Sequence, residues 1–427
     1  MGRLLHSCKT ACGALAPLVA ACSANGPPPS AARDSAPPPL GDDAASQTIG
    51  PYDKRIQYVG RIDPSDPAGP WAIQSATTVT VAFRGVTAAV EMNDETVNAG
   101  ESDFFDVLLD GRPPFVVTPA APAAWVSLAP LDDAGAPIAL AAGAHTLTLV
   151  KRTEATVGEV QFLGFQFDEV VPPAPDAAPT RRIEIVGDSI ACGYGVEAAS
   201  ANDPECNANG LGQGGYGQGL EDAYASFGVV AARALNAQWH VTCESGVGIV
   251  RNTDNGYIDP RPMPAIYPLL HPDDPTNATR WPVTQWAANG STVVTATPDV
   301  VILELGGNDL SLTIADGGMR PPIAVGSPSD PPDAGPTLVG GFIPFVGQLA
   351  ADYPNAAIVL VANAPPLQEA MEAVVAAYGD GGVEADAGLH VAGYLANLPY
   401  PGGVAPGIRT LRNKPRPARS WQASSRE

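Results

Sequence analysis

A proline-rich segment divides this chain into two regions with different hydrophobic patterns. Residues 171–180 read VPPAPDAAPT, a composition typical of an extended linker. Before this segment, short apolar runs are broken by Gly, Pro and Asp, whereas after it buried strands alternate with helical stretches. We therefore predict an all-β sandwich over residues 55–168, a linker over 169–180, and an α/β domain with a parallel sheet over 181–407.

The predictions of a β-sandwich and of an α/β domain rest on the following segments. Expected strands of the sandwich are 79–83, 104–109 and 145–150, and Asp-Gly at 110–111 is a turn signal. Expected elements of the α/β domain are the strands 182–186, 241–243, 300–303 and 357–361 and the helices 223–235 and 342–349. Residues 321–336 are expected to form an irregular insertion.

The composition limits the classes of partner and cofactor. A net charge of -22 argues against nucleic acid, because a phosphate backbone needs a basic surface. A hydrophobic content of 45% is enough for a sizeable buried core. No cysteine and histidine spacing typical of zinc is present, so neither a metal nor an organic cofactor is expected. The oligomeric state does not follow from the composition.

The first 54 residues indicate export. Basic residues precede a short apolar run over 11–21, as in a secretion signal. Val-Ala-Ala-Cys at 19–22 resembles a bacterial lipobox, so we predict a lipoprotein signal peptide over 1–22 and lipidation of Cys22. The alternative is an ordinary signal peptide with an incidental cysteine. The composition of residues 23–54 predicts a Pro/Ala-rich linker. We expect the protein to be a secreted outer-membrane lipoprotein that faces the periplasm or the cell surface. Its lipid anchor would be its only contact with the membrane.

A serine follows the first strand of the expected α/β domain. Gly-Asp-Ser-Ile at 187–190 comes directly after the strand 182–186. Open parallel sheets place reactive groups at the carboxyl ends of their strands, where a turn and a following helix also present N–H donors. Ser189 is therefore a candidate nucleophile. By itself the tetrapeptide is ordinary turn chemistry, and a structural role is an equal alternative.

Two later blocks strengthen the catalytic interpretation. Gly-Gly-Asn-Asp at 306–309 ends another buried strand, where the amide of Asn308 can donate a hydrogen bond to a developing oxyanion. One such donor is worth roughly 3 kcal/mol. Ser-Gly-Val-Gly at 245–248 also follows a strand, so the N–H of Gly246, or of Gly248 as an alternative, is a second candidate donor.

In this order and at these strand ends, the three blocks resemble those of the SGNH (GDSL-type) hydrolases. The resemblance implies that Ser189 is the nucleophile and that Gly246 and Asn308 complete the oxyanion hole. Further blocks are similar to carbohydrate esterase family two, namely Tyr-Val-Gly-Arg at 58–61, Lys-Arg-Thr-Glu at 151–154, Cys-Gly-Tyr-Gly at 192–195 and Glu-Asp-Ala-Tyr at 221–224. This family implies a jelly-roll sandwich followed by a flavodoxin-like, three-layer SGNH domain.

The same resemblance implies an acetylxylan esterase-like activity, the removal of acetyl groups from polysaccharide or related sugars by acyl transfer. An SGNH enzyme acting on lipids or peptidoglycan is one alternative. A carbohydrate-binding surface lipoprotein that lacks the catalytic histidine and has lost turnover is another. Trp71, Trp281 and Trp286 are candidates for stacking on sugar rings, and equally for the core.

The catalytic histidine is the part of the pattern that is missing. The family places it near the C-terminus in a Gly-x-x-His-Pro or Asp-x-x-His-Pro block, which this sequence lacks. His6 lies in the signal, and His145 and His240 are expected to be structural. His271 precedes the asparagine block, the wrong order for the family. His390 is the only late candidate, and its surroundings predict a strand.

The last residues have a different character. Residues 408–427 carry six Lys and Arg against one acid and show no apolar periodicity. A shifted frame over 407–410 can encode Gly-His-Pro-Asn, so our hypothesis is a frameshift or gene-model error, and a genuine basic tail is the alternative. A gene end without His-Pro in any shifted frame would contradict it.

Three cysteines follow Cys22, namely Cys192, Cys206 and Cys243. Because their number is odd, one thiol has no partner within the chain, and a Cys192–Cys206 bridge is one possible pairing.

Overall fold

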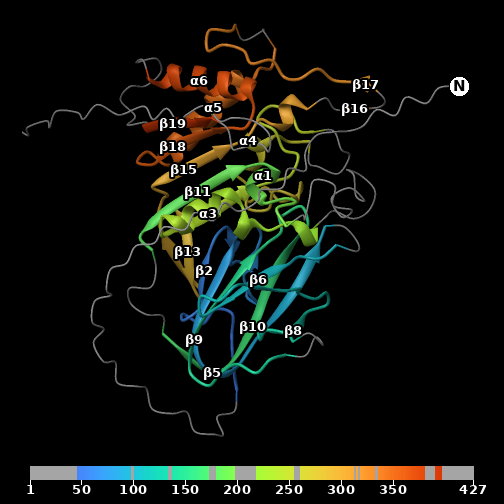
Figure 1. Ribbon diagram of the computed structural model, residues 1–427, viewed down its shortest axis with the longest axis vertical. Helices are drawn as coiled ribbons and strands as arrows, with labels where there is room; N and C mark the ends of the chain where they lie inside the picture. Colours follow the sequence, from blue (N-terminus) through green and yellow to red (C-terminus); the bar gives the residue numbers. More distant parts are fainter. Residues whose placement is uncertain are drawn as a thin grey trace, which may run out of the picture.

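The computed structural model describes residues 46–97, 101–132, 137–172, 179–197, 218–253, 260–311, 314–315, 318–331, 335–379 and 390–396. An antiparallel β region and a parallel α/β region follow each other along the long axis (Figure 1). The expected lipidation site Cys22, the signal peptide and the basic tail lie outside the described residues. Among the helices that are described, none has the length and apolar character needed to cross a bilayer.

Twelve antiparallel strands form the β-sandwich. They are β1 (Gln47–Ile49), β2 (Gln57–Val59), β3 (Ile62–Asp63), β4 (Trp71–Ala72), β5 (Thr78–Thr96), β6 (Phe105–Leu109), β7 (Phe115–Val117), β8 (Ala124–Ser127), β9 (Ala144–Lys151), β10 (Gly158–Val171), β13 (Gln285–Asn289) and β14 (Thr292–Thr295). The long strand β5 pairs with β2, β8, β9 and β10 along different stretches, so it links the two faces of the sandwich. Three phenylalanines of β10, Phe162, Phe165 and Phe167, are fully buried in the core between these faces.

The second region is a five-stranded parallel sheet with the order β12-β11-β15-β18-β19. Its strands are β11 (Arg181–Gly187), β12 (Ala237–Cys243), β15 (Val300–Glu304), β18 (Ala357–Ala362) and β19 (His390–Ala396). Its helices are α1 (Ser189–Cys192), α3 (Phe227–Ala234), α4 (Met263–Ile266), α5 (Leu338–Asp352) and α6 (Pro365–Gly379), with the 3₁₀ turns η1 (Gln218–Leu220), η2 (Ala223–Ala225) and η3 (Asn308–Leu310) and the short pair β16 (Ile314–Ala315) and β17 (Gly318–Met319). The strand order reverses between β11 and β15, and such a switch point opens a crevice at the carboxyl ends of the strands.

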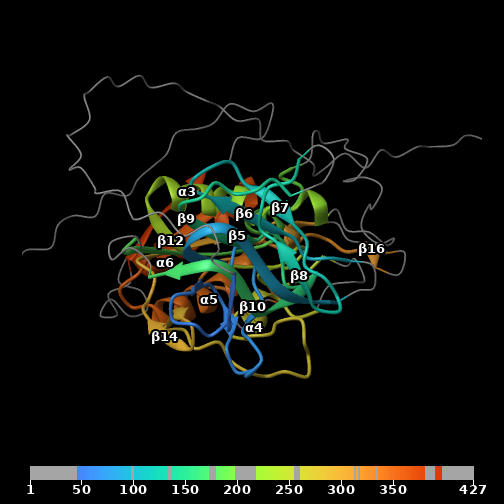
Figure 2. The ribbon, with the colours of Figure 1, turned by 90° about the horizontal axis from the view of Figure 1, so that it is seen from below.

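Helices cover the two faces of the parallel sheet. Residues of α5 and α6 pack with inward-facing residues of β15 and β18 in one core. Residues of α1 and α3 pack with β11 and β12 in a second core, which also contains Ala76 and Val150 of the sandwich. Figure 1 shows α5 and α6 on the outer face and α3 on the face toward the sandwich. Viewed from the sandwich end, the β-strands lie in front of the α/β layers (Figure 2).

The all-β and parallel α/β regions predicted from the sequence are both present, but some segments cross the expected boundaries. β1 lies in the expected linker 23–54 and pairs with β10, which itself continues to Val171. The hairpin β13–β14 comes from the region expected for the α/β domain, yet β13 pairs with β2 and extends the sheet of the sandwich. The expected helix 223–235 divides into η2 and α3 at Ser226.

A buried ion pair joins the two regions. Arg61, which follows β2, donates a hydrogen bond to Glu184 of β11 at 3.2 Å, and the two side chains are 0% and 1% exposed. The guanidinium lies over the rings of Tyr267 and Trp281, with centroid distances of 4.5 and 5.5 Å. The Tyr267 hydroxyl also donates to Glu184 at 3.0 Å. A buried charge without its partner is strongly destabilising. These contacts therefore keep the sandwich and the α/β region packed against each other in this arrangement.

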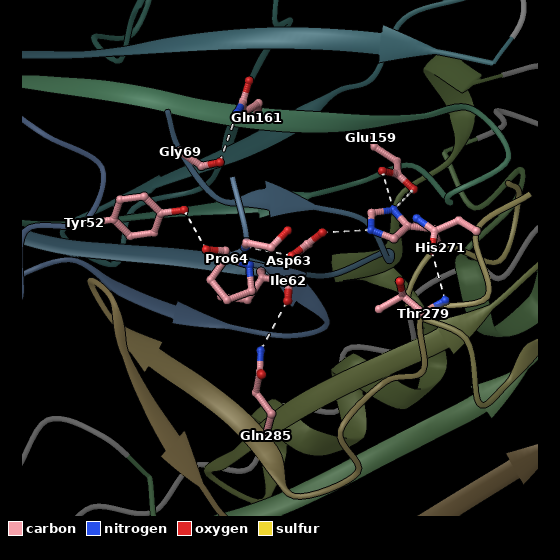
Figure 3. A network of polar contacts seen from close by, with 12 residues as sticks. Tyr52, Ile62, Asp63, Pro64, Gly69, Glu159, Gln161, His271, Thr279 and Gln285 are labelled. Atoms are coloured by element: carbon pink, nitrogen blue, oxygen red, sulfur yellow. Dashed lines mark hydrogen bonds and ion pairs between the residues drawn. The ribbon is translucent and has the colours of Figure 1, made fainter. Parts of the chain in front are cut away.

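His271 makes a second polar link, shown in Figure 3. Its Nε2 lies 3.0 Å from Asp63, and its Nδ1 lies 2.8 Å from Glu159, so the ring bridges two acids of the sandwich. Burial by itself would lower the pKa of His271, but the hydrogen bond to Glu159, its charge and the contacts with Asp63 outweigh burial and raise the pKa to about 9. At neutral pH the ring is therefore protonated and donates to both carboxylates.

We expect the contribution of His271 to stability to depend on pH. Its folded pKa exceeds the usual value of 6.5, so the contribution is complete below pH 6.5 and is lost as pH rises through about 9. The shift corresponds to at most about 3 kcal/mol. Urea unfolding of the wild type and of His271→Gln at about pH 6 and pH 10 checks this, since the gap in unfolding free energy should shrink at the higher pH. A gap that stays constant would contradict the ion-pair assignment.

Candidate active site

The three predicted site residues come from neighbouring strand ends of the parallel sheet. Ser189 follows β11, Gly246 follows β12, and Asn308 follows β15. These strands are adjacent and parallel, so their carboxyl ends lie at one edge of the sheet. Residues that are far apart in the chain therefore lie close together in space, at the switch point between β11 and β15.

Asp188 shapes the turn that presents Ser189, the predicted nucleophile. Its side chain accepts a hydrogen bond from the N–H of Ile190 at 3.0 Å and caps helix α1, of which Ser189 is the first residue. Gly187 has no room for a side chain, because an added Cβ would lie 2.4 Å from the carbonyl oxygen of Glu304. Ser189 is half-buried, and no described residue makes a hydrogen bond to its hydroxyl. This hydroxyl is thus free to meet a substrate.

Asn308 connects the nucleophile turn with the segment after β12. Its side-chain nitrogen donates to Asp188 at 3.2 Å and to the carbonyl oxygen of Val247 at 2.8 Å. The amide therefore lies between the residue before Ser189 and the residue after Gly246. This contact brings the predicted nucleophile and both predicted oxyanion donors into one site.

The segment 244–252, which we call the oxyanion loop, distinguishes its two candidate glycines. The N–H of Gly248 donates to the side chain of Asn252 at 3.0 Å, so this donor is already used. Gly246 has a φ of +81°, a left-handed conformation that favours glycine. Within the described part of the chain the N–H of Gly246 meets no acceptor, which favours Gly246 over Gly248 as the donor to an oxyanion.

Asp309 holds the oxyanion loop and was not singled out by the sequence. Its carboxylate accepts the backbone N–H groups of Ile249, Val250 and Arg251, each at 2.8 Å. Burial raises the pKa of Asp309, while these three hydrogen bonds oppose the rise. The only sequence signal was its place beside Asn308 in the Gly-Gly-Asn-Asp block, which gave no indication of the loop it binds.

Buried acids lie beneath the nucleophile turn. Burial raises the pKa of Asp188 to about 6, and the charges of Asp309 and Glu154 add to this effect. Burial and then the charge of Asp188 raise the pKa of Glu304 well above its usual range, and the two side chains hydrogen bond to each other. Glu304 also accepts from the side chain of Asn363 at 2.9 Å. The raised pKa of Glu304 favours a protonated carboxyl group beside Asp188, which reduces the repulsion between the two acids.

A disulfide connects α1 with the end of β12, directly before the oxyanion loop, and it corrects the pairing considered from the sequence. Cys192, the last residue of α1, is bonded to Cys243, the last residue of β12. A Cys192–Cys206 bridge is therefore wrong. Pairing in the parallel register sets Cys243 beside Gly187, two residues before the start of α1. Cys206 lies outside the described residues.

Three described histidines have other partners. His145 hydrogen bonds to Asp110 at 2.8 Å within the sandwich, as expected for a structural residue. His240 is buried and stacks on Trp286 at 3.8 Å between ring centroids, and burial lowers its pKa to about 4. His271 is held by the two acids described above. None of these three rings hydrogen bonds to Ser189.

His390 is the first residue of β19, which confirms the predicted strand. Its backbone pairs with Ala357 at the start of the parallel strand β18. Ser189 follows the carboxyl end of its own strand, so His390 is placed at the opposite edge of the sheet. The backbone position therefore argues against His390, the only late candidate, as the catalytic base.

One group of described residues has the composition of a possible metal site. Ligand atoms of Glu154, Cys192 and Glu221 lie within 4.8 Å of one another. Because the sulfur of Cys192 is in a disulfide, it is not a thiolate ligand, and the group does not suit a metal.

The tryptophans considered for stacking on sugar rings differ in burial. Trp281 and Trp286 are buried and belong to the core, so they are not sugar platforms, whereas Trp71 is half-buried.

Comparisons with known proteins point to one group. A family model of the carbohydrate esterase 2 N-terminal domain matches residues 58–175. The cellulase/esterase CelE of Acetivibrio thermocellus is 34% identical over 273 residues, which are 64% of this chain and 28% of that protein. An acetylxylan esterase / glucomannan deacetylase of Cellvibrio japonicus is 24% identical over 326 residues, 75% of each chain. The chain thus spans little more than a quarter of CelE.

Solved structures agree with this grouping over both regions. A family two carbohydrate esterase from Clostridium thermocellum in complex with cellohexaose has 29% identity and a TM-score of 0.56, covering 79% of this chain and 87% of that one. A family two carbohydrate esterase from Cellvibrio japonicus shares the fold at 21% identity and a TM-score of 0.57, covering 78% and 84%. The sandwich followed by a parallel α/β domain is therefore the architecture of these structures too.

We expect the Cys192–Cys243 bond to stabilise the fold. It spans 51 positions of the chain, and closing a loop of this size contributes up to about 4 kcal/mol in the chain-entropy model. Replacing both cysteines by Ala should therefore lower the unfolding free energy by roughly this amount in urea titrations. Cys206→Ala is the matched control and should leave stability unchanged. Equal losses in the double variant and the control, or a Cys192–Cys206 peptide in non-reducing mass spectrometry, would contradict the pairing.

Proposed function

Since this chain is a relative of carbohydrate esterase family 2, we propose that it is a serine esterase that removes acetyl groups from a polysaccharide. One observation carries the proposal, the contact of Asn308 with both Asp188 and Val247. It joins the Ser189 hydroxyl and the Gly246 N–H, neither of which has a hydrogen-bond partner among the described residues, with an amide donor. These are the groups that acyl transfer needs besides a base. The acetylxylan esterase of Cellvibrio japonicus and the cellohexaose complex support an acetylated carbohydrate as the substrate.

In this reaction Ser189 Oγ attacks the acetyl carbonyl carbon while a base takes the hydroxyl proton. The N–H of Gly246 and the amide of Asn308 hold the oxyanion. Both N–H bonds of the Asn308 amide are used in the free protein, so one of its two contacts is exchanged for the bond to the oxyanion. The intermediate then collapses, the bond between the acetyl carbon and the sugar oxygen breaks, and the sugar leaves as an alcohol with the proton that the base took from Ser189. In the second half of the reaction the base takes a proton from water, which attacks the acetyl-serine; acetate leaves and the proton returns to Ser189 Oγ. No cofactor takes part in these steps.

A second candidate is a carbohydrate-binding protein with this fold and without turnover. The positions of the described histidines favour it, since three rings are hydrogen bonded elsewhere and His390 lies at the far edge of the sheet. A serine hydroxyl without a base is a weak nucleophile. The binding site would then be the same edge of the sheet, with Ser189 as a polar contact for the sugar.

We expect Ser189→Ala to lower kcat/KM by at least about 10³-fold if the chain is an esterase, because the variant lacks the atom that forms the acyl-enzyme. The measurements are hydrolysis of 4-nitrophenyl acetate and release of acetate from acetylated xylan. His390→Ala is the matched control and should stay within about twofold of the wild type.

Equal rates for the wild type and Ser189→Ala would contradict the esterase. Retention of both proteins on acetylated xylan would then support the binding protein. A large loss in His390→Ala would contradict the placement of this residue away from the site.

A further inference from the structure

The Lys-Arg-Thr-Glu block at 151–154 reaches from the sandwich into the catalytic region. It begins at Lys151, the last residue of β9, and all four of its residues are buried. Lys151 pairs with Asp103 at 2.6 Å, which fixes the start of the block within the sandwich. The carbonyl oxygen of Arg152 accepts the N–H of Ala223 at 3.1 Å, and its side chain donates to the carbonyl oxygen of Glu221 at 3.0 Å. The block is thus fastened on both sides of the interface.

Glu154 extends this block to the oxyanion loop. Its carboxylate accepts a hydrogen bond from the backbone N–H of Ser245, the residue immediately before Gly246. Glu154 is 0% exposed, so water does not compete for this contact. A hydrogen bond to a buried carboxylate is among the stronger hydrogen bonds in proteins. The position of Gly246 therefore depends on a side chain of the other domain.

Glu221, in the Glu-Asp-Ala-Tyr block, lies against the same carboxylate. The acid oxygens of Glu154 and Glu221 are within 4.8 Å of each other. Burial, followed by the charge of Glu154, raises the pKa of Glu221 well above its usual range. It fills the space beside Glu154, and its raised pKa favours the neutral form there.

We propose that Glu154 is a positioning residue of the active site, through which the β-sandwich holds the oxyanion loop in the geometry that Gly246 needs. The inference rests on the proposed function for its effect on catalysis, whereas the anchoring itself is independent of activity. It assigns a role to the Lys-Arg-Thr-Glu block, which the esterase mechanism leaves unexplained. The sandwich is then part of the catalytic apparatus and not only a neighbouring module.

The test uses the full chain with Glu154→Leu, which removes the acceptor, and Glu154→Gln, which keeps an oxygen for the Ser245 amide. Glu159→Leu is the matched control, because it also removes a sandwich acid at the interface but one that contacts His271. Hydrogen exchange of the peptide covering 244–250 measures the anchoring, and kcat and KM on 4-nitrophenyl acetate measure its effect. If Glu154→Leu does not fold, Glu154→Asp, which withdraws the carboxylate, takes its place.

We expect the 244–250 peptide to exchange at least about tenfold faster in Glu154→Leu, and kcat to fall by about 10²-fold at nearly constant KM. Glu154→Gln and Glu159→Leu should stay within about threefold of the wild type in both measurements. Unchanged exchange in Glu154→Leu, or faster exchange with an unchanged kcat, would overturn the proposal. A wild-type rate no higher than that of Ser189→Ala overturns the esterase alone, and exchange then decides whether Glu154 anchors the loop.

Discussion

The ion pair between Arg61 and Glu184 sets the relation between the two halves of the molecule. Both side chains are removed from water, and the aromatic rings of Tyr267 and Trp281 enclose the guanidinium. Charges in such surroundings tolerate little displacement, because each has lost its hydration and depends on the other. Contacts between the two regions, above all the contact of Glu154 with Ser245, depend on the arrangement that this ion pair stabilises.

The candidate site is held by several independent connections at the carboxyl edge of the parallel sheet. Asn308 joins the turn of Ser189 to the oxyanion loop, and Asp309 accepts three N–H groups of that loop. The Cys192–Cys243 bond joins α1 to the end of β12, directly before the loop. Donors that are fixed before the substrate arrives do not have to reorganise during the reaction, and this is the main source of their catalytic effect.

The architecture matches an esterase, but the activity also needs a general base, and the described histidines lie away from Ser189. The sequence pattern already placed His145 and His240 in structural roles, and their partners in the fold agree with that interpretation. For His390 the local pattern predicted a strand correctly but could not tell which edge of the sheet its first residue would occupy. Pairing with Ala357 decides this, because a parallel strand carries its first residue to the edge opposite the nucleophile.

Local patterns in the sequence determined the two classes of fold and the three strand-end blocks at Ser189, Gly246 and Asn308, because strand alternation and turn chemistry are read from neighbouring residues. The tertiary structure alone decided the disulfide, the pairing of the hairpin β13–β14 with the sandwich, and the contact of Glu154 with the oxyanion loop. In each of these the partners are far apart in the chain, and their choice depends on the path of the backbone, which no local pattern specifies.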